Sequence, residues 1–87
     1  MRVESQRFEF VPTGGDPHKP IRIIGFHDYS PRHSRKVDLW RFELPNGVQP
    51  AALNGMEAET WGAVLRILRS WFPNEADHSW AERIKAA

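Results

Sequence analysis

The chain has 87 residues, of which 40% are hydrophobic and 26% charged, and its formal net charge at neutral pH is +1. This length leaves room for one hydrophobic core, so we expect a single domain over 1–87. The small net charge argues against a whole-molecule field that attracts nucleic acid. Because cysteine is absent, disulfides, thiolate zinc sites and cysteine nucleophiles are excluded.

The N-terminal sequence Met1-Arg2-Val3-Glu4 is unlike a secretory signal. No apolar run reaches the length of about 18 residues that a membrane span needs. We therefore expect a cytoplasmic protein without a membrane partner.

The first half of the chain predicts β-strands. In 5–11 polar and apolar side chains alternate, with Phe8 and Phe10 on one face, which is typical of a half-buried strand. A loop rich in proline and glycine follows, and β-branched residues then predict a second strand over 21–29. Gly25 within it indicates a bulge or a close approach of another backbone.

A third strand is predicted over 36–44, with its aromatic residues on one face. Val37 and Leu39 are apolar on the other face, which indicates either a bulge or burial on both sides where this strand begins. The Asn-Gly pair at 46–47 favours a tight hairpin turn. A short fourth strand over 48–53 should lie at an edge of the sheet, because its proline donates no hydrogen bond.

The segment 57–72 predicts an amphipathic helix. Asn54 and Glu57 have the spacing of an N-cap with a reciprocal glutamate, and Pro73 ends the helix by removing a donor. The apolar stripe of this helix comprises Trp61, Val64, Leu65, Leu68, Trp71 and Phe72.

The tail over 74–87 predicts a second, short helix. Ser79 and Glu82 have capping-box spacing, and Trp80 and Ile84 form an i, i+4 apolar pair. An element this short needs a surface on which to dock.

These patterns predict the α+β class: a small antiparallel sheet in 1–56, in ββββα order, covered on one face by the helix 57–72. We expect the helical tail 74–87 to fold against an edge of the sheet. The expected core consists of Phe8, Phe10, Ile21, Ile23, Trp40, Phe42, Leu44, Trp61, Val64, Leu65, Leu68 and Phe72.

The connection between the second and third strands is the first candidate binding site. It concentrates basic, aromatic and imidazole side chains within a few residues. Arginine and lysine at a hairpin tip can reach phosphates, and a tyrosine can stack on a base. The alternative is a solvated loop whose charges keep the edge of the sheet soluble. The candidate residues are Tyr29, Arg32, His33, Arg35 and Lys36.

The tail supplies a second candidate surface around Trp80. Tryptophan and arginine dominate the energetic centres of protein interfaces. Arg83 lies close to Trp80 in the sequence, and Arg66 and Arg69 lie on the outer side of the predicted helix. These four residues could belong to one partner surface or to a surface of self-association.

Catalytic and metal-binding patterns are not recognised. The four histidines lack helical i, i+4 spacing and compact clustering. No nucleophile elbow, Walker motif or dinucleotide-binding glycine pattern occurs. We therefore expect no enzymatic activity, no cofactor and no metal.

The sequence KVDLWRF at 36–42, followed by Gly47, Pro50, Gly55 and a tryptophan-bearing helix, resembles the single-stranded-DNA-binding fold of the transcriptional positive-cofactor family. The resemblance covers roughly residues 36–68. It implies a curved four-stranded sheet followed by one helix that supports dimerisation. The lysines that the family places between the turn and the helix are absent here, where 51–54 reads AALN.

These observations favour a small non-enzymatic module that binds another protein, as an adaptor, an accessory subunit or an inhibitor. The alternative is a nucleic-acid-binding domain that places the basic loop 28–36 against phosphates. Self-association as a homodimer is compatible with either function.

Overall fold

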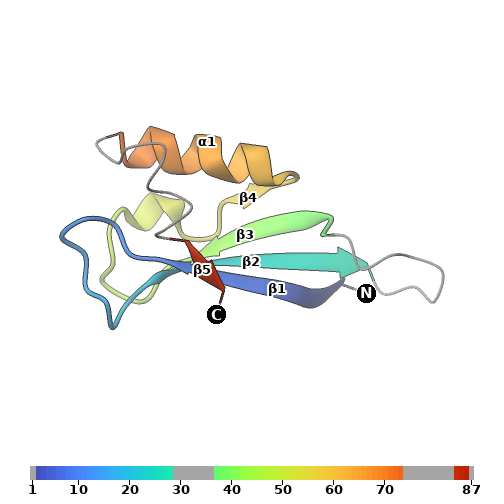
Figure 1. Cartoon of the computed structure of the whole chain (residues 1–87), viewed down its shortest axis with the longest axis horizontal. Coiled ribbons are helices and arrows are strands. Elements are labelled where there is room, and N and C mark those ends of the chain that lie inside the picture. Colours follow the sequence, from blue (N-terminus) through green and yellow to red (C-terminus); the bar gives the residue numbers. More distant parts are fainter. Residues whose placement is uncertain (1, 29–36, 74–83, 87) are drawn as a thin grey trace.

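A computed structural model describes residues 2–28, 37–73 and 84–86 of the chain. It confirms an α+β fold in which one helix packs on one face of an antiparallel sheet (Figure 1). The strand order is β4-β3-β2-β1-β5. The elements are β1 (Arg2–Phe10), β2 (Ile21–Asp28), β3 (Leu39–Glu43), the 3-10 turn η1 (Ala51–Leu53), β4 (Glu57–Ala58), α1 (Trp61–Trp71) and β5 (Lys85–Ala86).

The register of β1 against β2 contains a bulge at Ser5. Glu4 lies opposite Phe26 and Gln6 lies opposite Gly25, so one extra residue is inserted in β1. A bulge shifts the alternation of side chains by one position. Glu4 and Arg7 therefore lie on the same face although they are three residues apart, and their charged groups are 2.7 Å apart.

Gly25 is required by the packing of β3 on β2. A Cβ at this position would lie 2.8 Å from Cζ3 of Trp40 and 2.9 Å from Cγ2 of Val37. The indole of Trp40 thus occupies the space that a side chain on β2 would fill. The sequence indicated a close approach at this glycine, and the approaching group is a side chain rather than a backbone.

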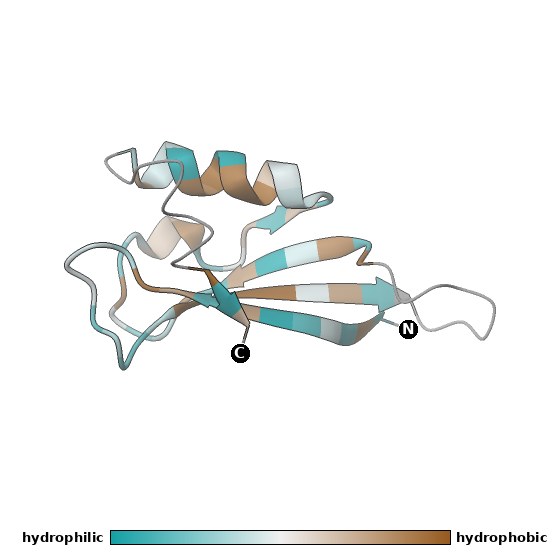
Figure 2. Cartoon of the chain, in the orientation of Figure 1, coloured by the Kyte–Doolittle hydropathy of each residue, from teal (hydrophilic) through white to brown (hydrophobic). Residues whose placement is uncertain are grey.

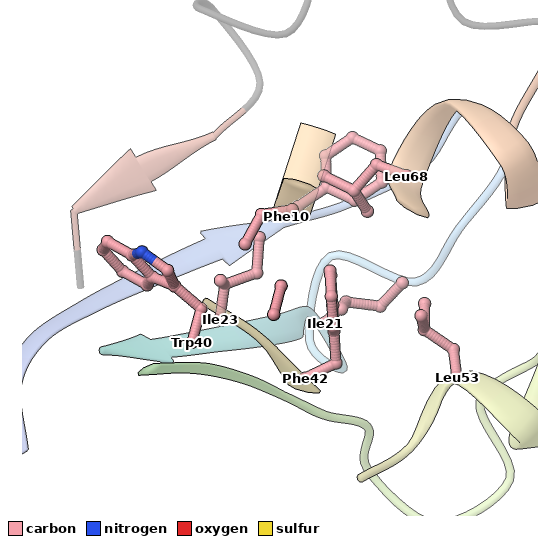
Figure 3. Packing of buried hydrophobic residues seen from close by; sticks show 9 residues of the cluster. Phe10, Ile21, Ile23, Trp40, Phe42, Leu53 and Leu68 are labelled. Carbon is pink, nitrogen blue, oxygen red and sulfur yellow. The ribbon is translucent and has the colours of Figure 1, made fainter. Parts of the chain in front are cut away.

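The hydrophobic core lies between the sheet and α1 (Figure 3). In Figure 2 the hydrophobic residues of α1 face the sheet. Most of the expected core residues are buried, and Phe8, Leu44, Trp61, Leu65 and Phe72 are partly buried against them. Leu53 and Ala58 are additional members that the sequence did not predict. The buried cluster comprises Phe10, Ile21, Ile23, Trp40, Phe42, Leu53, Ala58, Val64 and Leu68.

The predicted start of the helix is wrong. Glu57 and Ala58 are extended because they pair with β3. The helix begins at Trp61, where the hydroxyl of Thr60 accepts a hydrogen bond from the Ala63 N–H at 3.1 Å. A threonine that accepts from the N–H three residues later is an N-cap.

The cap assigned to Asn54 is also wrong. The Asn54 Oδ1 accepts the N–H of Leu44 at 3.0 Å, so this side chain joins two loops instead of starting a helix. Gly55 has a φ of 86°, a left-handed conformation outside the helical range. The cap prediction failed because Asn54 and Glu57 have the spacing of a cap, but the backbone between them is not helical.

Three further expectations need correction. The predicted strand 48–53 is a turn ending in η1, whose buried Leu53 donates its N–H to the Pro50 carbonyl at 3.0 Å. The end of the predicted tail helix is β5, which pairs with β1. Trp71 is 38% exposed at the last position of α1 instead of lying in its buried stripe. The remainder of the predicted tail helix, 74–83, lies outside the described residues.

Candidate functional site

Most of the residues predicted to bind a partner lie outside the described part of the chain. Arg66 and Arg69 are the exceptions, and both are exposed on α1. The candidates outside the described residues are Tyr29, Arg32, His33, Arg35, Lys36, Trp80 and Arg83.

The face of the sheet opposite α1 is formed by described residues of all five strands. Directly opposed residues in neighbouring antiparallel strands share a face, and successive residues of a strand alternate. The registers therefore define this surface, which we call the open face. It comprises Arg2, Glu4, Arg7, Glu9, Arg22, Ile24, Phe26, Leu39, Arg41, Glu43, Glu57 and Lys85.

An apolar stripe runs along the middle of the open face. Ile24 is 3% exposed and Leu39 is 8% exposed, although no described helix or strand covers this side of the sheet. Ile24 lies in register between Arg7 and Arg41. Long arginine side chains can cover apolar neighbours with their aliphatic stems while the charged heads remain in water. We therefore attribute the burial of Ile24 to these flanking arginines.

The aromatic ring in this stripe is also covered by an arginine. The guanidinium carbon of Arg41 lies 5.1 Å from the centroid of the Phe26 ring, within the range of a cation–π contact. The same guanidinium is 3.0 Å from the carboxylate of Glu57. Arg41 is thus held by two neighbours, and the ring of Phe26 is half-buried beneath it.

Charges of both signs alternate across the open face. One row reads Lys85, Glu9, Arg22 and Glu43 from β5 to β3. Within it the groups of Arg22 and Glu9 are 3.9 Å apart. Exposed pairs of this kind contribute little to stability, about 0–1 kcal/mol each. Their arrangement instead gives the surface a mixed pattern of charge, with five basic and four acidic side chains among the residues named above.

A cavity of about 470 Å³ lies beside the loop that joins β1 to β2. It is formed by the loop 12–19, the turn 47–49 and Phe72. The carboxylate of Asp16 accepts the N–H of His18 at 2.8 Å, so it stabilises its own loop. Neither histidine nor cysteine lines the cavity among the described residues. We assign no chemistry to it.

Two further absences apply to the described residues only. No three histidine, aspartate or glutamate side chains gather there in a way that could hold a metal ion. No helix within 2–28, 37–73 or 84–86 combines the length and the apolar character that a membrane crossing requires. His27, at the end of β2, has a buried Nδ1 without a hydrogen-bond partner.

Comparisons with known proteins identify no relative: no family model, no curated protein and no solved structure matches the chain. The resemblance to the positive-cofactor family therefore gains no support from them.

The open face was not among the sequence candidates. The signal that could have revealed it was the apolar residue on the second face of the third strand. Leu39 is buried on this side of the sheet.

Proposed function

We propose that the protein is a small non-enzymatic module that binds another protein through the open face, as an adaptor, an accessory subunit or an inhibitor. The observation that carries this proposal is the apolar stripe on the side of the sheet that α1 leaves uncovered. Ile24, Phe26 and Leu39 lie there between arginine and glutamate side chains.

This arrangement has the composition of a protein interface. Interfaces place apolar and aromatic groups at the centre, are enriched in arginine, and surround the centre with polar groups. When a partner displaces water from the stripe, the arginine heads can turn from their neighbours to acceptors on the partner. Arg41 is the best placed for this exchange, because it touches both Phe26 and Glu57.

The balanced charge supports a protein partner over a nucleic acid. Phosphate binding needs several cations that are not neutralised by their neighbours. On the open face Arg7, Arg22 and Arg41 each have a carboxylate within 4 Å. The nucleic-acid alternative rests on the basic residues of 29–36, which lie outside the described part of the chain, and no observation on the sheet favours it.

The proposal is tested by affinity capture from a lysate of the native host, with mass spectrometry of the bound proteins. Bait carrying Arg41→Glu should lose a partner that the wild-type bait enriches. A carboxylate then replaces the guanidinium beside Phe26 and repels the acceptor groups of the partner. Bait carrying Arg66→Glu has the same charge change on the exposed side of α1 and should retain it. Equal capture by all three baits would remove the open face from the binding site.

A further inference from the structure

The outer edge of β1 is only partly paired by the strands that the structure describes. β1 has nine residues, but β5 pairs only with Phe8 and Glu9. Among the described residues no strand pairs with this edge between Val3 and Arg7. An edge of this kind presents backbone donors and acceptors to another strand.

The direction of the free backbone groups follows from the neighbouring strands. The carbonyl of Phe26 accepts the N–H of Asp38 at 2.7 Å, so the backbone groups of Phe26 point toward β3. Backbone groups alternate in direction along an antiparallel strand. Those of Gly25 and His27 therefore point toward β1. On β1 the N–H and C=O groups of Glu4 and Arg7, which oppose Phe26 and Ile24, point outward.

We propose that this edge pairs with the same edge of a second copy of the chain. The two β1 strands run antiparallel, with Glu4 of each copy opposite Arg7 of the other. Opposite charges that face each other across two strands are favourable. Both side chains are 41% exposed. Within one chain they pair with each other, and in the dimer each also faces its opposite charge on the second copy. The same two residues thus supply the outward backbone groups and the complementary charges.

The bulge makes this register compatible with two-fold symmetry. A two-fold axis perpendicular to the sheet keeps each residue on its own face, so residues that oppose each other must share a face. In a regular strand the fourth and seventh residues would lie on opposite faces. The bulge at Ser5 places Glu4 and Arg7 on the same face, and the axis passes through the bulge.

The contact is short because β5 occupies the edge at Phe8 and Glu9. It leaves only 4–7 of each copy for pairing, and we expect a weak dimer. Its symmetry keeps the helices of both copies on one side of the joined sheets. The two open faces then lie together on the other side.

Charge reversal tests the register. Sedimentation equilibrium from micromolar to about millimolar protein should show a concentration-dependent wild-type dimer. Glu4→Arg and Arg7→Glu each place two pairs of like charges across the interface, so each should weaken association by about tenfold to a hundredfold. An equimolar mixture of the two variants restores both opposite pairs and should form a heterodimer. Arg66→Glu is the control: it makes the same charge change as Arg7→Glu, but on α1 and away from the edge of β1.

Cross-linking tests the same geometry independently. The chain has no cysteine, so Ser5→Cys places a single thiol near the two-fold axis and should give a covalent dimer on mild oxidation. Ser70→Cys, on the exposed side of α1, should not. Circular dichroism melts confirm that each variant is folded. A wild-type chain that stays monomeric throughout, or a mixture that stays monomeric while the wild type dimerises, overturns the proposal.

Discussion

Gly25 shows how one residue without a side chain lets an indole cover a strand. Replacement by alanine would bring a Cβ within 2.8 Å of Trp40, closer than carbon atoms can pack. We expect Gly25→Ala to lower the free energy of unfolding by about 1–3 kcal/mol, as overpacking of a core does. Urea denaturation followed by tryptophan fluorescence measures this change.

Gly62 provides the matched comparison. A Cβ there would meet only the Thr60 hydroxyl, at 3.9 Å, and the residue lies in the first turn of α1. We expect Gly62→Ala to stabilise the protein by about 0.5–1 kcal/mol, because alanine has the higher helix propensity. If both glycine substitutions changed stability equally, the packing of Trp40 on Gly25 would be wrong.

The two faces of α1 predict a second contrast. Leu68 is fully buried in the core, whereas Arg66 is exposed. We expect Leu68→Ala to cost about 2–5 kcal/mol because it leaves a cavity between helix and sheet. Arg66→Ala should change stability by less than about 0.5 kcal/mol. Urea melts of the two variants that gave equal losses would contradict the assignment of the buried face.

At the scale of elements, the start of α1 depends on Thr60. Its hydroxyl is the acceptor for the Ala63 N–H, and removal of such a cap typically costs about 0.5–2 kcal/mol. We expect Thr60→Ala to lower stability by this amount, measured by urea denaturation. Thr60→Ser retains the hydroxyl and should stay near the wild type. A loss of the same size in Thr60→Ser would show that the methyl group, not the cap, is responsible.

The helix itself was predictable from its apolar spacing, but its first turn was not. The residues before Trp61 were compatible with either the first turn of the helix or a preceding strand, since Asn54 and Glu57 also have capping spacing. Ala58 decides between them: it is buried and pairs with Trp40 of β3, so the backbone around it is extended and not helical. Such pairing depends on a strand that is distant in the sequence. Local patterns therefore identified the helix but could not exclude a strand at its predicted N-terminus.

The candidate site was harder to predict than the fold. Alternation in the strands showed which residues share a face, including Arg7 with Glu9 and Arg41 with Glu43. It did not show which strands are neighbours. The order β4-β3-β2-β1-β5 places Ile24 between Arg7 and Arg41. Neither the apolar stripe nor the alternating rows of charge can be derived before this order is known.

The C-terminal strand β5 offers a further prediction. β5 covers Glu9, whose outward backbone groups would otherwise extend the free edge of β1. A chain truncated after Ile84 lacks β5. In the proposed register, Arg2 of one copy can then pair with Glu9 of the other. We expect this truncation to tighten association, measured by sedimentation equilibrium beside the full chain. Weaker association of the truncated chain would indicate that β5 takes part in the contact instead of limiting it.

At the scale of the whole molecule, the two faces of the sheet have separate roles. The face under α1 contains the aromatic cluster of Phe8, Trp40 and Trp61, with ring centroids 4.8–5.9 Å apart, and it stabilises the fold. Within 2–28, 37–73 and 84–86 no such layer lies above the open face. Substitutions of its exposed charges should therefore alter binding with little change in stability, which is the behaviour that a binding module requires.

Salt dependence then distinguishes the proposed partner class from the nucleic-acid alternative. A surface of balanced charge around an apolar stripe should bind its captured protein with affinity that falls by less than about tenfold between 50 and 200 mM salt. A protein making 6–10 phosphate contacts would lose about 10³–10⁵ in affinity over the same range. Titrations with the captured protein and with a single-stranded oligonucleotide measure both slopes. Tight oligonucleotide binding with the steep slope, abolished by joint replacement of Arg32, Arg35 and Lys36 with alanine, would instead place the function in the 29–36 connection.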